Sequence, residues 1–342
     1  MILIFSIEND TSTSSVVKWL KHFGEEVVVI NSDDDTSKFI QLNNDGIFFK
    51  NMISGKEFNL LDVKSCWWRR SGIGLKNFLK SKAKKDLLID NIDISEIIIG
   101  SRSLIRSETE SLREYIFNRI YENCRINIGS PKLYGLNRLV TMDLARKKGF
   151  KVPEFEIISN LKQISLSKYI GDYFVSKAIS DGIYHQIDGK MFYSYTELHQ
   201  KMYYKNQDLN VFPSLITNVI DKKMEIRSFY LDGHFFSMAI FSQSNDQTKV
   251  DFRKYSSKKP NKTEPYRLPL EVEKKLKAIF DEYGLNCGSA DLILDKNNDF
   301  VFLEINPVGQ YGMTSEPGNY NLDKIIAQYL IHGKLYNTES AK

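Results

Sequence analysis

Three oxygen-bearing side chains lie close together near the C-terminal end of the sequence: Asp291, Glu304 and Asn306. Two runs of alternating apolar and polar residues flank a polar turn at 296–299, which predicts a β-hairpin. Carboxylates that share a sheet face repel unless a proton or a cation lies between them. Carboxylate and amide oxygens suit Mg²⁺, which completes its shell with water and phosphates. The hairpin indicates a Mg²⁺-nucleotide site; a solvated strand face with incidental acidic residues is the alternative.

One register of this hairpin places the two carboxylates opposite each other. It starts with Asp295 paired to Phe300 around the turn. The pairs that follow are Leu294 with Val301, Leu292 with Leu303 and Asp291 with Glu304. One face of the hairpin is then apolar, and the other carries both carboxylates and Asn306.

Other side chains suited to a nucleotide precede the hairpin. Lys177 ends a predicted strand at 173–177, before a glycine-containing turn, where its ammonium and the loop amides could bind phosphate. Glu225 and Arg227 alternate onto one strand face, where the carboxylate could hold a ribose and the guanidinium a phosphate. The alternatives are a surface lysine at a strand end and a cross-strand ion pair.

Composition places the chain among globular proteins. Its 342 residues are 42% hydrophobic, enough for about two or three domains with their own cores. The net charge of +4 does not indicate a nucleic-acid partner. No stretch is apolar for long enough to span a membrane, so we expect no membrane partner and a cytoplasmic location. Cys66, Cys124 and Cys287 lack Cys-x-x-Cys spacing and indicate neither a disulfide framework nor a zinc site.

The order of elements predicts an α/β protein that opens with a Rossmann-like domain. Apolar strands at 2–7 and 27–30 flank a helix that stops at Gly24. No Gly-x-Gly-x-x-Gly follows the first strand, so dinucleotide binding is not predicted. Positions 126–135, which contain two glycines and a proline, are typical of a linker. The basic stretch at 249–267 predicts a loop that could meet an acidic ligand, or else a solvated lysine-rich loop.

Trp67, Trp68, Arg69 and Arg70 end a predicted strand that begins at residue 63. Such a run fits an interface or the wall of a cleft. It fits equally well tryptophans that cover a core while the arginines extend their charged ends into water. The sequence leaves both interpretations open.

Taken in order, these residues resemble the ATP-grasp superfamily over nearly the whole chain. The motifs that carry the resemblance are Asn137-Arg138 before a helix, Lys177, Glu225-x-Arg227, Asp251-Phe252-Arg253, Asp291, Leu303-Glu304-Ile305-Asn306-Pro307 and Gly309-Gln310. The sequence is most similar to the graspetide synthetases, the ATP-grasp maturases of ribosomally made peptides, including those of grasp-with-spasm systems. This finer resemblance rests on the Trp-Arg-Arg strand, the strand Phe-Ser-x-Ala-Ile-Phe-Ser-Gln and the short glycine loop.

The resemblance implies an ATP-grasp fold of α/β (α+β) class with an N-terminal Rossmann-like domain. The domains implied are a pre-ATP-grasp domain at 1–127, a central subdomain at 128–212 and a C-terminal subdomain at 213–342 that carries the Mg²⁺ site. The implied cofactors are ATP and a pair of Mg²⁺ ions. The implied partners are a ribosomal precursor peptide, with a leader and a core rich in Thr, Ser, Lys, Asp and Glu, and further copies of the chain in a homo-oligomer.

Carried over residue by residue, the resemblance makes Asp291, Glu304 and Asn306 the Mg²⁺ ligands. It assigns nucleotide contacts to Arg138, Lys177, Thr217, Asn218, Val219, Ile220 and Glu225, with 217–220 as the hinge beside adenine and Glu225 on the ribose. Arg227 and Arg253 would face the γ-phosphate and the acyl phosphate. The sequence departs from the family pattern at Arg138, where a lysine is usual, and at Thr217-Asn218, where Gln-Glu is usual.

The implied enzyme is an ADP-forming carboxylate-amine or carboxylate-alcohol ligase that closes ester or amide macrocycles between peptide side chains. A peptide carboxylate attacks the γ-phosphorus of ATP, and a hydroxyl or amine of the same peptide then displaces phosphate from the acyl phosphate. Two alternatives stay open: an ATP-grasp ligase that adds an amino acid to a peptide or protein, and a nucleotide-binding regulatory protein without turnover. The complete set of Asp291, Glu304 and Asn306 counts against the regulator.

Overall fold

The structure is a computed structural model, and its contacts divide the chain into two compact units. Unit 1 comprises Met1–Tyr134 and Leu322–Lys342, and unit 2 comprises Gly135–Asn321. The residues described are 1–70, 73, 88–89, 92–93, 102–132, 135–180, 184–187, 190–193, 196–244 and 261–335. Within them, no helix is long and apolar enough to cross a membrane. The predicted domain boundaries after residues 127 and 212 stay predictions.

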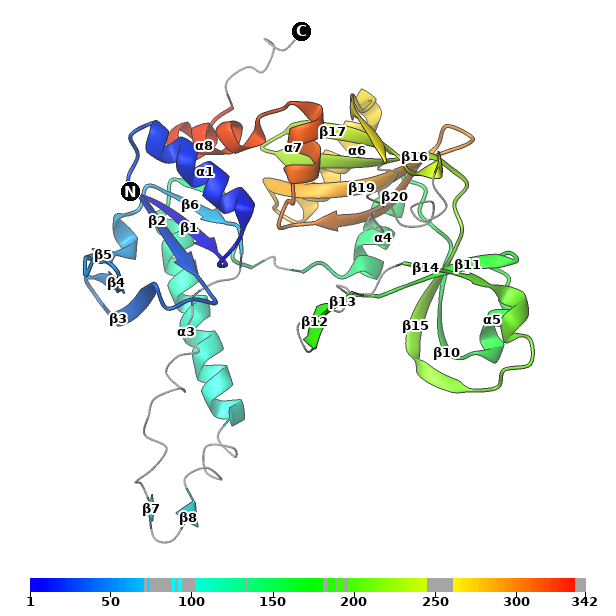
Figure 1. The fold of residues 1–342 in the computed structure, drawn as a ribbon, viewed down its shortest axis with the longest axis horizontal. Coiled ribbons are helices and arrows are strands. Elements are labelled where there is room, and N and C mark those ends of the chain that lie inside the picture. Colours follow the sequence, from blue (N-terminus) through cyan, green and yellow to red (C-terminus); the bar gives the residue numbers. More distant parts are fainter. Residues whose placement is uncertain are drawn as a thin grey trace. The chain divides into compact units, whose positions relative to one another are not determined.

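Unit 1 is built around a parallel sheet with the strand order β2-β1-β6-β9 (Figure 1). Its strands are β1 (Ile2–Ser6), β2 (Val27–Asn31), β6 (Ser65–Trp68) and β9 (Ile126–Ile128). Strand β1 is fully buried, as expected for an apolar strand in the middle of a parallel sheet. The chain passes from β1 to β2 on one side and later to β6 on the other. This reversal is a topological switch point, where side chains after β1 and β6 meet at the carboxyl ends of the strands.

The described part of unit 1 has three α-helices: α1 (Thr11–His22), α3 (Arg102–Asn123) and α8 (Leu322–His332). The N-terminus of α1 is capped by Asp10, whose carboxylate accepts a hydrogen bond from the Thr13 amide at 2.9 Å. Helix α8 packs against α1, and the Lys324 ammonium lies 5.3 Å from the ring centre of Trp19 (Figure 1). The chain therefore returns to its first unit after completing the second.

A small antiparallel sheet completes the core of unit 1. Its strands, in the order β3-β4-β5, are β3 (Ser37–Asn43), β4 (Gly46–Asn51) and β5 (Glu57–Asn59), followed by the 3₁₀ turn η1 (Leu60–Asp62). Ile47 and Phe49 of β4 pack in one apolar cluster with Phe5 and Trp68 of the parallel sheet. A two-residue pair of strands, β7 (Leu88–Ile89) and β8 (Ile92–Asp93), lies between β6 and α3 in the chain.

Unit 2 contains an antiparallel sheet in the order β10-β15-β11-β14. Its elements are α4 (Arg138–Lys147), β10 (Phe155–Asn160), α5 (Lys162–Leu166), β11 (Tyr173–Lys177), β14 (Glu197–Gln200), η3 (Lys201–Tyr204) and β15 (Asn210–Asn218), with the hairpin β12 (Tyr184–Ile187) and β13 (Lys190–Tyr193) between β11 and β14 in the chain. One sheet face packs against α5 through Phe174, Ile158 and Ile164. Because side chains alternate along a strand, Val175 and Lys177 lie on the other face.

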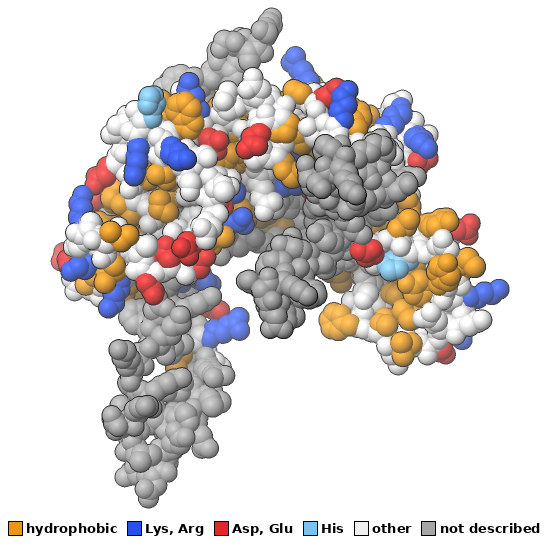
Figure 2. Space-filling view, viewed as in Figure 1, with side chains coloured by type: hydrophobic (Ala, Val, Ile, Leu, Met, Phe, Trp, Pro, Cys, Tyr) orange, Lys and Arg blue, Asp and Glu red, His pale blue; other side chains and the backbone are white. Residues whose placement is uncertain are grey.

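Hydrophobic side chains gather at the surface of this part of unit 2 (Figure 2). The most exposed are Leu166 in α5, Met202 and Tyr203 in η3, and Phe212 in β15, of which Phe212 is 86% exposed. Helix α5 and η3 contact each other. Apolar surface of this kind is typical of a protein that binds a partner.

The second sheet of unit 2 has the order β18-β17-β16-β19-β20. Its elements are β16 (Lys222–Leu231), β17 (His234–Phe241), η4 (Ser242–Ser244), β18 (Lys262–Tyr266), α6 (Leu270–Glu282), β19 (Cys287–Asp295), β20 (Phe300–Asn306) and α7 (Gly312–Gly318). The apolar side of α6 packs on this sheet, where Phe280 stacks on Tyr230 with ring centres 4.3 Å apart. In this sheet β16, which carries Glu225, pairs directly with β19, which carries Asp291.

Strands β19 and β20 form the predicted hairpin, with a register that changes along its length. The pairs near the turn are Leu294 with Phe300, Ile293 with Val301 and Leu292 with Phe302; beyond a bulge they are Asp291 with Glu304, Ala290 with Ile305 and Ser289 with Asn306. The predicted Asp295–Phe300, Leu294–Val301 and Leu292–Leu303 pairs are therefore wrong. The turn closes one residue early, because the Asp295 amide donates to the Asp299 carbonyl at 3.0 Å. The bulge at Leu303 restores the predicted pairing of Asp291 with Glu304, which is confirmed.

Candidate active site

Three neighbouring strands place Arg227, Asp291 and Glu304 in one row. Arg227 of β16 lies opposite Asp291 of β19, which in turn lies opposite Glu304 of β20. Residues directly opposite each other in an antiparallel sheet share a face. The Arg227 guanidinium lies 3.3 Å from a carboxylate oxygen of Asp291. Two predicted metal ligands and one predicted phosphate-facing arginine are therefore side by side.

Glu304 links the two larger sheets of unit 2. Its Oε2 accepts hydrogen bonds from Lys177 Nζ at 2.7 Å and from Arg138 at 2.6 and 3.1 Å. Lys177 is the last residue of β11, and Arg138 is the first residue of α4. Arg138 also donates to the Ala178 carbonyl and, at 3.3 Å, to the Ser180 carbonyl, so it holds the chain that follows β11.

Glu304 is held as an anion by these neighbours. Burial raises the pKa of its carboxyl, but the positive charges of Lys177 and Arg138 and their hydrogen bonds outweigh that effect and hold the pKa well below its usual range. With Arg227 and Asp291 included, the group has three cationic side chains and two carboxylates. The resulting positive charge suits a bound polyphosphate.

The loop after β20 is attached to the same row of residues. Asn306 lies on the face of Glu304, two residues further along, and its side-chain oxygen accepts a hydrogen bond from the Val308 amide at 3.0 Å. The Gln310 carbonyl accepts hydrogen bonds from Arg227 Nε at 3.3 Å and Ser289 Oγ at 3.1 Å. Arg227 is therefore fixed by a carboxylate on one side and by this loop on the other.

The donor set fits a Mg²⁺ ion. Asp291, Glu304 and Asn306 supply hard oxygen atoms from one face. Among the described residues, no group donates a hydrogen bond to Oε1 of Glu304, so this oxygen can bind a cation while Oε2 keeps its present partners. Within the same residues, no third Asp, Glu, His or Cys joins the pair in a metal-binding group. Asn306 as the third ligand stays a prediction.

Glu225 sits on the same face as Arg227 in a buried polar cluster. Its Oε1 accepts hydrogen bonds from Lys222 Nζ at 2.5 Å and Ser242 Oγ at 2.8 Å. Sequence reasoning missed Lys222, because residues three apart on a regular strand face opposite ways. A register shift between Lys222 and Met224 turns the lysine to the side of Glu225.

Only part of the predicted hinge at 217–220 lies on the sheet face that carries Lys177. Thr217 lies opposite Val175 and shares its sheet face with Lys177, whereas Asn218 lies opposite Phe174 on the other face. The Asn218 amide donates to the Glu154 carbonyl at 3.0 Å. Val219 and Ile220 follow the end of β15. Arg253 lies outside the described residues, as does most of the basic stretch.

No protein-family model and no curated protein matches the chain. Solved structures match over its whole length. A RiPP-associated ATP-grasp ligase of Chryseobacterium gregarium, solved in complex with ADP and a leader and core peptide, has 21% identity and a TM-score of 0.72, with 97% of each chain covered. The macrocyclase MdnC of Microcystis aeruginosa, bound with precursor peptide MdnA, has 21% identity and a TM-score of 0.71, with 98% of this chain and 100% of that chain covered. The macrocyclase MdnB of the same organism has 19% identity and a TM-score of 0.68, with 97% and 99% covered.

The chain has the ATP-grasp fold. The α/β class and the ATP-grasp fold predicted from the sequence are therefore confirmed. Of the predicted site residues, unit 2 brings Arg138, Lys177, Arg227, Asp291 and Glu304 into one connected group.

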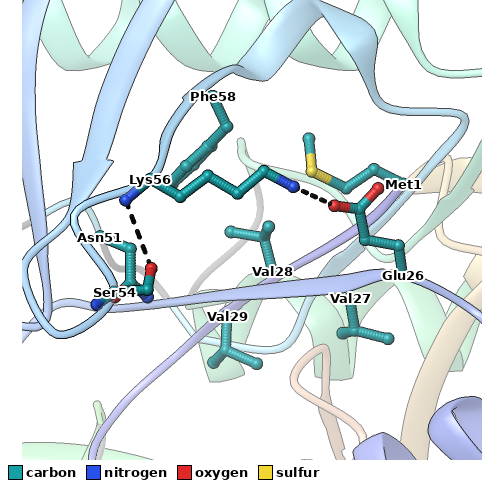
Figure 3. A pocket seen from close by; sticks show the side chains of 9 residues that line it. All are labelled: Met1, Glu26, Val27, Val28, Val29, Asn51, Ser54, Lys56 and Phe58. Carbon is teal, nitrogen blue, oxygen red and sulfur yellow. Dashed lines mark hydrogen bonds and ion pairs between the residues drawn. The ribbon is translucent and has the colours of Figure 1, made fainter.

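Unit 1 has a shallow pocket that is separate from these residues. It is lined by Val27, Val28 and Val29 of β2 together with Met1, Glu26, Asn51, Ser54, Lys56 and Phe58 (Figure 3). An ion pair of 2.7 Å between Lys56 and Glu26 crosses it, and both side chains are more than half exposed. No predicted site residue of the ATP-grasp fold lines this pocket.

Proposed function

We propose that the protein is an ADP-forming, Mg²⁺-dependent peptide maturase that closes ester or amide macrocycles between side chains of a ribosomal precursor peptide. The observation that carries this proposal is the full-length likeness to an ATP-grasp ligase solved with ADP and a leader and core peptide. The charged group around Glu304 supports it, because it offers both a metal-binding face and cations for phosphate. The exposed apolar side chains of α5 and η3 suit a peptide partner.

The position of each site residue suggests its role. Asp291, Glu304 and Asn306 would hold Mg²⁺, which when bound supplies positive charge to the phosphate oxygens and orients them. Lys177 reaches Glu304 from β11 of the other sheet and Arg138 reaches it from α4, and we assign both to the phosphates of ATP. Arg227, fixed by Asp291 and the Gln310 carbonyl, would hold the γ-phosphate and then the acyl phosphate.

The remaining assignments complete the nucleotide site. Glu225 would accept hydrogen bonds from the ribose hydroxyls, while its hydrogen bond from Lys222 orients its carboxylate. Residues 217–220 would lie beside adenine, and Arg253 would approach the acyl phosphate. We also propose that the protein acts in the cytoplasm as a homo-oligomer.

The test is a mass measurement on the precursor peptide after incubation with the protein and Mg²⁺-ATP. The proposal expects loss of one water for each ring, with one ADP formed each time. Glu304→Gln should abolish both, whereas Glu282→Gln, at an exposed carboxylate paired with Lys148, should leave both unchanged. A peptide that gains mass, and does so only when a free amino acid is added, would instead identify the protein as an amino-acid ligase. ATP binding without ADP release would favour a nucleotide-binding regulatory protein without turnover.

A further inference from the structure

A histidine of unit 2 connects two hydroxyl groups on the sheet face opposite to Lys177. His199 belongs to β14, which pairs with β11, and it lies opposite Phe174 (Figure 1). Its Nε2 is 2.8 Å from Oγ of Ser176, and its Nδ1 is 3.0 Å from the hydroxyl oxygen of Tyr204. Both ring nitrogens are therefore used, and the three side chains connect β11, β14 and η3.

The ring of His199 is fixed by stacking as well as by hydrogen bonds. It stacks on the buried ring of Phe174, with ring centres 5.0 Å apart and an angle of 21° between the ring planes. Burial lowers the pKa of His199 and the charge of Glu197 opposes this only in part, so the ring is neutral at pH 7. A neutral imidazole has one N–H and one acceptor nitrogen, so one of the two hydroxyls accepts and the other donates. The orientation of the Ser176 hydroxyl thus depends on the ring.

Ser176 lies directly before Lys177, whose ammonium must be placed accurately to bind phosphate. Strand β14 begins with Glu197, opposite Ser176, so Lys177 lies beyond the end of β14. Its ammonium nevertheless reaches Glu304 in the other larger sheet of unit 2, at 2.7 Å. A long lysine side chain loses much rotamer freedom when it is held in one position, and a mobile backbone at its Cα would add to that cost. The contact of Ser176 with His199 holds the backbone one residue away.

We infer that His199 is a positioning residue for the nucleotide: through Ser176 it fixes the end of β11, and with it the ammonium of Lys177, for the phosphates of ATP. This rests on the proposed function, in which Lys177 is assigned to those phosphates. His199 acts indirectly, because it lies on the face of the sheet opposite to Lys177. Loss of its contact with Ser176 lets the ammonium move away from the phosphates, so ATP binds less tightly.

The experiment measures the dissociation constant of Mg²⁺-ATP for the full-length protein by calorimetry. His199→Asn keeps a polar atom near the position of Nδ1 and loses the contact with Ser176, so it should weaken ATP binding about fivefold, as expected for one hydrogen bond. His199→Gln, which places a polar atom near the position of Nε2, should recover part of this loss. Ser176→Ala is a smaller change and should weaken binding as much as His199→Asn. His234→Asn is the matched control, since His234 is an exposed histidine of the same unit.

A double-mutant cycle with Lys177→Met distinguishes positioning from a general effect on folding. Lys177→Met should weaken Mg²⁺-ATP binding more than His199→Asn does, and the two changes together should weaken it no further, because His199 acts through Lys177. A melting curve for each variant verifies folding. Unchanged ATP affinity in His199→Asn and Ser176→Ala, unchanged affinity in Lys177→Met, or an equal loss from His199→Asn in both backgrounds would overturn the inference. ATP affinities that follow the expected pattern, beside a precursor peptide whose mass never changes, would overturn the proposed maturase alone.

Discussion

The ammonium of Lys177, at the end of β11, lies 2.7 Å from the carboxylate of Glu304, in the other sheet of unit 2. Arg138 shares the same carboxylate oxygen. Both cations are therefore held in place by Glu304 before any phosphate is bound. Two elements far apart in the chain depend on this one side chain for their charge balance.

Replacing Glu304 with Gln should reduce the rate of ADP release strongly and the stability of the protein only slightly. The change keeps the shape but leaves Lys177 and Arg138 without an anion, so we expect ADP release to fall by about 100-fold or more. The free energy of unfolding should fall by only about 1–3 kcal/mol, because hydrogen bonds to the amide oxygen remain. Steady-state ADP assays and denaturant titrations measure the two effects. Unchanged ADP release would remove Glu304 from the catalytic group.

The buried pair of Lys222 and Glu225 should show strong energetic coupling. Lys222→Met leaves a buried carboxylate without its cation and should cost about 3–5 kcal/mol. Adding Glu225→Gln should recover part of this loss, with a coupling of about 1–3 kcal/mol in a double-mutant cycle. The exposed pair of Lys277 and Asp281 serves as the control, with an expected coupling of about 0.5 kcal/mol or less. Additive losses at the buried pair would contradict the cluster.

Gly309 should tolerate no side chain. Its φ is +65°, and a Cβ there would lie 3.1 Å from Cys287 Sγ and 3.1 Å from the Phe229 ring. Gly284 has a similar φ of +62° with nothing within 4 Å, so Gly284→Ala reports backbone strain alone, about 1–2 kcal/mol. Gly309→Ala should cost about 1–3 kcal/mol more, because of overpacking. It should also slow ADP release, because the loop that holds Arg227 shifts; equal melting temperatures for the two variants would contradict the contact.

Asp10 should make unit 1 sensitive to acid. Burial raises the pKa of its carboxyl, but Arg69, the Thr13 amide and Arg70 together lower it below its ordinary value. A lowered pKa means that the stabilisation is complete above the ordinary pKa of about 3.9 and is lost as the pH falls below it. The stability difference between wild type and Asp10→Asn should therefore shrink from about pH 5 downward. Denaturant titrations at several pH values measure this difference; a constant difference would exclude the effect.

The local sequence pattern predicted the strands that carry the site residues better than it predicted the contacts between those residues. Alternation of apolar and polar residues was sufficient to place Asp291 and Glu304 on the polar face of the hairpin, because the other face is buried. Their direct pairing also required the bulge at Leu303, which compensates for the early closure of the turn. The bulges at Leu303 and beside Lys222 were not predictable in this way, since turn closure and packing determine where an extra residue is accommodated. The contacts of Lys177 and Arg138 with Glu304 depend on how elements pack, which no spacing in the sequence encodes.

The strand that ends in Trp67 and Trp68 shows the same limit. Both tryptophans are buried, as one of the two sequence interpretations required. Arg69 does not extend into water, because Asp10, from the loop after β1, meets it inside the unit. The partner of a buried charge is thus set by topology, and the parallel order of β1 and β6 was needed to find it.

The return of α8 to unit 1 has a consequence for synthesis. Leu322, Ile326, Ala327 and Leu330 of α8 are buried in unit 1. Translation proceeds from the N-terminus at about 5–20 residues per second, so the first strands emerge long before the helix that completes their core. Unit 2 is continuous in sequence, whereas unit 1 needs a segment that is made after unit 2. The core of the first strands to be made is therefore complete only after α8 has been added to it.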